Sequence, residues 1–135
     1  MKNTPCPVPR PAAPNLTYKA ATPISIQNAA SANPQDAWSV HSIAHVLEMT
    51  ERHEEGIEWV AGLESDWSTV NNFQFHLYWH KCLYHLERGE FEAVLRIYDE
   101  QISSDIESDF YLDICNCSSL LWRLEMFGID VGNPG

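Results

Sequence analysis

Two pairs of histidines are the residues of this chain best placed to do chemistry. His41 and His45 are four residues apart, and so are His76 and His80. Side chains four apart on a helix share one face, so each pair can present two imidazoles to one metal ion. Glu48 follows His45 by three residues and is a candidate third ligand on the same face. The spacing therefore predicts a site at which zinc could be held by all four histidines.

A second interpretation of the four histidines needs no metal. The rings can hydrogen-bond to one another, to carboxylates and to tryptophan edges between packed helices, or contact a bound ligand. The glutamate that follows the first histidine in zinc peptidases is absent, because Ser42 and Leu77 occupy those positions. We therefore expect no cofactor, with zinc as the alternative.

The cysteines do not indicate an enzyme. Cys6, Cys82, Cys115 and Cys117 include no pair with the two-residue gap of a zinc knuckle or a redox motif, so buried structural thiols are expected. Nothing lowers the pKa of a thiol in so acidic a chain, which argues against a cysteine nucleophile. We expect no enzymatic activity, and a metal-dependent activity is the alternative.

Charge narrows the choice of partner. All 19 acidic residues lie after residue 35, whereas three of the eight basic residues lie before it. A body this acidic repels phosphate backbones, so we expect no nucleic acid partner, and a basic peptide or protein fits better. The charge can equally serve solubility alone. The apolar runs are too short to span a membrane, and the first residues lack the apolar stretch of a secretory signal, so we expect a cytoplasmic protein.

The chain divides into a proline-rich, basic arm at 1–32 and a helical domain at 33–135. Prolines at nearly every second position of the arm exclude helix and favour extended backbone. Periodicity and capping residues in the domain predict five helices and no strand. They are expected at 36–50, at 53–63, from a cap at Asn71 or Asn72 to just before Gly89, at 90–102 and at 110–127, with a loop at 66–69.

An internal repeat sharpens this expectation. Residues 51–57 align with residues 89–95 at an offset of 38 positions, and both segments join a longer helix to a shorter one. The second copy has Gly89, Phe91 and Tyr98 where tetratricopeptide repeats have a glycine and two aromatic residues. The expected fold is all-α, an α-α superhelix of tetratricopeptide-like helical hairpins.

Four segments, 33–46, 75–80, 86–91 and 120–132, resemble the tetratricopeptide repeat protein 38 family, and the resemblance covers residues 33–132. It implies the same α-α superhelix and says little about biochemistry, because this family has no established activity. The proline-rich arm departs from the family pattern, so we expect the chain to correspond to an internal segment of that fold.

Tetratricopeptide repeats line their concave groove with the first helix of each hairpin. On that pattern the chain is an interaction module that binds a peptide or protein partner in this groove. Its lining would consist of Trp38, His41, His45, Glu48, His76, Trp79, Leu83, Cys115, Ser118 and Trp122, with His80 one step round from the face and able to turn towards it.

The last helix is apolar nearly all round, which requires cover on two sides. We expect either a homodimer through this helix or cover by the proline-rich arm.

Overall fold

The computed structural model describes residues 36–69, 73–103 and 110–132, and in these ranges the chain is helical without strands. The helices are α2 (Ala37–Met49), α3 (His53–Gly62), α4 (Glu64–Trp67), α5 (Phe73–Glu87), α6 (Phe91–Ile97), the π-helical turn η1 (Tyr98–Ile102) and α7 (Tyr111–Met126). The predicted all-α fold of packed helical hairpins is confirmed. The proline-rich arm lies outside the described residues.

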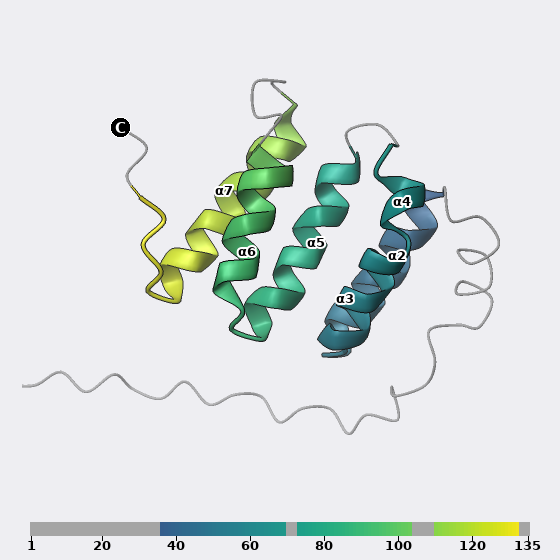
Figure 1. Cartoon of the computed structure of the whole chain (residues 1–135), viewed down its shortest axis with the longest axis horizontal. Helices are drawn as coiled ribbons and strands as arrows, with labels where there is room; N and C mark the ends of the chain where they lie inside the picture. The colour runs from purple at the N-terminus through teal and green to yellow at the C-terminus, as the bar shows by residue number, and fades with distance from the viewer. Residues whose placement is uncertain (1–35, 70–72, 104–109, 133–135) are drawn as a thin grey trace, which may run out of the picture.

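Helix α5 is the centre of the arrangement (Figure 1). It packs against α2 and α3 on one side and against α6, η1 and α7 on the other. Because every other long helix contacts α5, side chains from α2 and α7 can meet on its surface.

Three helices end in the same turn, and this turn carries the internal repeat. The residue after the cap has a positive φ in each case, at Glu51 (59°), Gly89 (72°) and Gly128 (79°). The next backbone N–H then donates to the carbonyl five residues back: Arg52 to Leu47 at 2.9 Å, Glu90 to His85 at 2.9 Å and Ile129 to Leu124 at 3.0 Å. This is the Schellman ending of a helix, for which glycine is the usual residue. The turns after α2 and α5 are 38 positions apart, as the aligned segments predict.

A close contact between α3 and α5 explains why the first repeat has a glycine at position 56. Gly56 of α3 lies under the ring of Tyr84, and a Cβ atom at this glycine would sit 2.5 Å from the ring's Cζ. The Tyr84 hydroxyl donates to the carbonyl of Ala44 in α2 at 2.7 Å. One buried side chain thus contacts both helices of the first hairpin.

Two local expectations are wrong. The loop expected at 66–69 is in part the short helix α4, which buries Trp67 completely. The Trp67 ring contacts Tyr78 of α5 and its Nε1 donates to the Val60 carbonyl of α3 at 3.1 Å, so packing against the two neighbouring helices stabilises this short helix. Of the cysteines expected to be buried, Cys115 is exposed, because it lies on the outer side of α7; Cys82 and Cys117 are buried, and Cys6 lies outside the described residues.

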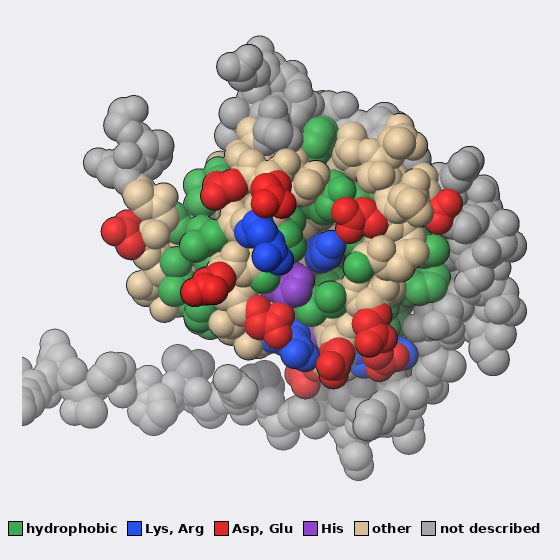
Figure 2. Space-filling model, viewed as in Figure 1, with side chains coloured by type: hydrophobic (Ala, Val, Ile, Leu, Met, Phe, Trp, Pro, Cys, Tyr) green, Lys and Arg blue, Asp and Glu red, His purple; other side chains and the backbone are tan. Residues whose placement is uncertain are grey.

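The face formed by α3, α5 and α6 is acidic, with basic side chains among the carboxylates (Figure 2). Lys81 pairs with Glu64 at 2.9 Å, and Arg88 pairs with Glu90 at 2.7 Å. None of the helices in the described part of the chain combines the length and apolar character that crossing a bilayer requires.

A four-histidine cluster as the candidate functional site

The two predicted histidine pairs meet between α2 and α5. His41 and His45 come from α2, and His76 and His80 come from α5. One ring nitrogen from each of the four lies within 4.8 Å of the others. Five of the ring pairs have centroids between 4.3 and 4.9 Å apart. The imidazoles therefore surround one small volume.

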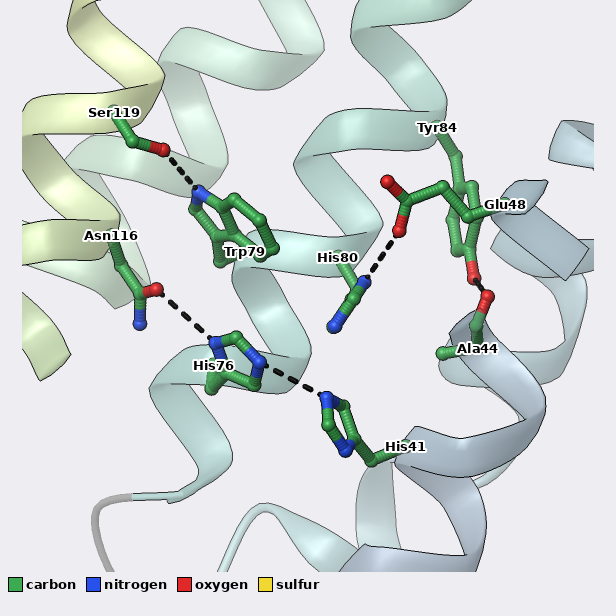
Figure 3. Close-up of polar contacts among 9 residues, drawn as sticks. All are labelled: His41, Ala44, Glu48, His76, Trp79, His80, Tyr84, Asn116 and Ser119. Carbon is green, nitrogen blue, oxygen red and sulfur yellow. Dashed lines mark hydrogen bonds and ion pairs between the residues drawn. The ribbon is translucent and has the colours of Figure 1, made fainter. Parts of the chain in front are cut away.

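His80 is fully buried, and its ring is turned towards the other three histidines, with which it makes ring contacts. Its Nδ1 lies 3.0 Å from a carboxylate oxygen of Glu48. The hydrogen bond to His80 lowers the pKa of Glu48, whose carboxylate accepts this bond from the Nδ1–H of His80. The other ring nitrogen of His80, Nε2, is buried without a hydrogen-bond partner, and in the neutral tautomer with its proton on Nδ1 it carries the lone pair. Figure 3 shows this nitrogen turned toward the rings of His41 and His76.

His76 has the same tautomer for a similar reason. Its Nδ1 lies 3.1 Å from the side-chain oxygen of Asn116 on α7, an atom that can only accept. The Nε2 lone pair of His76 then accepts from the Nε2–H of His41, at 3.0 Å (Figure 3). Two of the four rings thus have their second nitrogen fixed by an oxygen acceptor outside the cluster.

Burial and the charges of neighbouring histidines favour the neutral form of His41, His45 and His76. Desolvation, followed by the charges of neighbouring histidines, lowers the pKa of His41 to about 3. Desolvation is also the main cause that lowers the pKa of His76 to about 4, and it lowers the pKa of His45. A neutral imidazole carries the lone pair that a metal ion needs.

An aromatic and polar layer from α5 and α7 supports His76. Trp79 stacks on the His76 ring with centroids 5.2 Å apart and planes 12° from parallel. The Trp79 Nε1 donates to the Ser119 hydroxyl at 3.1 Å, and the Arg123 guanidinium lies 5.8 Å from the Trp79 ring centroid. These contacts fix the orientation of the His76 ring from the α7 side.

The expected face of α7 is displaced by one residue. We expected Cys115, Ser118 and Trp122 to line the groove, but all three are exposed and none contacts the histidines through a ring contact or hydrogen bond in the described structure. The residues directed at α5 are Asn116, Ser119 and Arg123, each one position later. One residue is about 100° of helix rotation, which is enough to move a side chain off the face.

Three further expected residues have distinct positions. Trp38 is 66% exposed and its ring lies 4.4 Å from that of Phe73, next to the cluster. Leu83 is buried, so it belongs to the core and not to an accessible groove. Glu48 lies beside His80 as a hydrogen-bond acceptor, which puts it behind the cluster and not among the ligand atoms.

The sequence reasoning missed Asn116 and Ser119. A signal for them exists: they are polar residues three apart on a helix that buries Cys117, Leu120 and Leu124 beside them, and Arg123 extends the same line by one turn.

No family model matches this chain, and no solved structure matches it. The resemblance to the tetratricopeptide repeat protein 38 family therefore stays a prediction, and the chemistry of the cluster has to be argued from the chain's own residues.

Proposed function

We propose that this chain is a helical-hairpin scaffold that binds one zinc ion through His41, His45, His76 and His80. The observation that carries the proposal is the Nε2 atom of His80, which is buried, has no hydrogen-bond partner and faces three other imidazoles. A buried polar atom without a partner is costly, and a metal ion at this point would satisfy it.

The distances suit tetrahedral coordination after a small contraction. Zinc binds imidazole nitrogen at about 2.0–2.1 Å, which separates two ligands of a tetrahedron by about 3.4 Å. The Nε2 atoms of His41 and His76 are already 3.0 Å apart. The longest separation in the set is 4.8 Å, so side-chain rotation must shorten it.

The outer contacts are those of a metal site. Histidine ligands of zinc usually donate their second N–H to a carboxylate or another oxygen, which orients the ring and makes the ligand more basic. Glu48 provides this contact for His80, and Asn116 provides it for His76. Glu48 also places a negative charge beside the cation.

Zinc binding would require one proton to move within the cluster. In the metal-free chain the Nε2–H of His41 fills the gap to His76. Moving that proton to Nδ1 of His41 frees a third lone pair without a change in net charge. Zinc can therefore enter without protonating or exposing any group of the cluster.

A direct test is zinc titration of the purified, chelator-treated chain, with metal content measured after gel filtration. We expect one zinc ion per chain, and loss of binding in His80→Ala. His85→Ala is the matched control, because His85 lies on the same helix and contacts Glu90 instead of the cluster. If His80→Ala is poorly folded by circular dichroism, His41→Ala provides the same test from α2. Failure of the wild-type chain to bind zinc would refute the proposal and favour a hydrogen-bonded cluster.

A second candidate is the interaction module expected from the sequence. The exposed Trp38 side chain beside the histidines favours it, because exposed tryptophans are common anchors for partners. Trp38→Ala should weaken binding of a peptide or protein partner without changing zinc content. Trp122→Ala is the matched control, since Trp122 is equally exposed but lies away from the cluster. If the two substitutions weaken partner binding equally, the surface beside the histidine cluster is not the binding surface.

A further inference from the structure

We infer that the zinc centre is open: His41, His76 and His80 hold the ion, and His45 is a displaceable ligand. Its coordination position faces solvent and accepts a small monodentate donor such as water, hydroxide or azide. This inference rests on the proposed function and assigns the ligand class of that site.

The four histidines differ in burial. His80 is fully buried, and His41 and His76 are partly buried. His45 is the exposed member of the set. A ligand exchanging with solvent would therefore reach the ion from the His45 side, where no backbone or core side chain has to move.

The four histidines also differ in how their rings are held. His80 is oriented by Glu48, and His76 is oriented by Asn116 and by the stacked Trp79 ring. His41 contacts the edge of the Phe73 ring, with centroids 5.0 Å apart, and the bond to His76 that it makes in the metal-free chain is lost when its proton moves to Nδ1.

Among the described residues His45 has ring contacts with His41 and His80, at 4.3 and 4.5 Å, and is acted on by the charge of Glu48, but no hydrogen bond holds it. A ring without an outer acceptor rotates away at little cost, whereas His76 and His80 have to break a hydrogen bond.

Three imidazoles set back from solvent and one replaceable position are the ligand set of reactive zinc centres. Structural zinc sites use four protein ligands, whereas catalytic sites keep one place for water or substrate. A site of three neutral histidines leaves the ion with its full double charge, which favours a small anion in the fourth place.

Cobalt(II) makes the fourth position visible, because its absorption spectrum depends on the donor set and geometry. The chain is loaded with one equivalent of cobalt, and azide is then titrated into the wild type and into His45→Ala, His80→Ala and His85→Ala. We expect His45→Ala to keep one cobalt ion per chain, with an affinity within about tenfold of the wild type. Azide should change its spectrum saturably, at lower concentration than in the wild type. His85→Ala should behave as the wild type, and His80→Ala should lose the metal.

The outcomes separate this inference from the proposed function. If the wild type binds no metal, the proposed function itself fails. If His45→Ala loses metal as completely as His80→Ala, His45 is an integral ligand of a closed site and the inference is overturned. Metal-loaded His45→Ala with a spectrum indifferent to azide would also overturn it.

Discussion

Acidification should destabilise the metal-free chain through the histidine cluster. The pKa values of His41 and His76 are lowered from 6.5 to about 3 and about 4 in the folded chain. In the unfolded chain both return to their ordinary value, so the unfolded state binds more protons between these limits. Stability is then complete above pH 6.5 and falls as the pH decreases through that value.

The size of the effect follows from the same shift. Between about pH 7 and about pH 5.5, one histidine that protonates only when unfolded removes about 1.3 kcal/mol of stability. Two such histidines would remove about 2.5 kcal/mol, which we reduce to about 2 kcal/mol because both rings are partly exposed and screened by solvent. With an ordinary urea dependence, the unfolding midpoint should fall by about 1 M.

Urea unfolding with a chelator present measures this loss, and a double variant isolates it. Carboxylates that protonate in the same pH range act on the wild type and on His41→Gln/His76→Gln alike. The double variant should therefore lose clearly less stability than the wild type over this range. Equal losses in the two proteins would show that these rings protonate as readily folded as unfolded, and the reasoning from burial would be refuted.

Three further outcomes are expected. Glu51 and Gly89 both have a positive φ, which glycine adopts more easily than other residues. Glu51→Gly should therefore leave the free energy of unfolding unchanged or raise it by up to about 0.5 kcal/mol, whereas Gly89→Ala should lower it by about 1 kcal/mol. Chemical denaturation in which both substitutions destabilise the chain, or both stabilise it, would contradict this. Gly56→Ala should lower the free energy of unfolding by about 1–3 kcal/mol, since the new Cβ meets a buried tyrosine ring, whereas Gly62→Ala in the same helix meets nothing within 4 Å and should be tolerated. The exposed apolar side of α7 should support a homodimer in sedimentation equilibrium, and Trp122→Glu should shift it toward monomer; a wild-type monomer would contradict this expectation.

The helices and the histidine face of α2 and α5 could be predicted from local patterns. The four-residue spacing of His41 and His45, and of His76 and His80, is enough to place each pair on one helix face. The glycine at position 89 likewise indicates the end of α5, where the structure has a Schellman turn. The same turn at Glu51 was not predicted, because glutamate is not a typical residue for a positive φ, although the repeat aligns this residue with Gly89.

Long-range packing decided what the sequence could not. The face of α7 was placed one residue off because a helix with apolar residues nearly all round gives no preferred side, and contact with Trp79 selects Asn116 and Ser119. Helix α4 is stabilised by the burial of Trp67 against Tyr78, a contact that the residues around 64–67 alone do not indicate. The buried position of His80 likewise depends on α5 being enclosed by both neighbours.

The Asn116–His76 hydrogen bond makes the motion of one helix matter to the whole cluster. In helical arrays the outer helices open more readily than the middle ones. When α7 separates from α5, His76 loses the acceptor that holds the proton on Nδ1, and Trp79 loses Ser119. The imidazole is then free to turn and to exchange tautomers. The opening and closing of α7 thus determine how long His76 keeps the orientation and tautomer that suit a bound ligand. Hydrogen exchange in α7 should therefore slow when the site is filled.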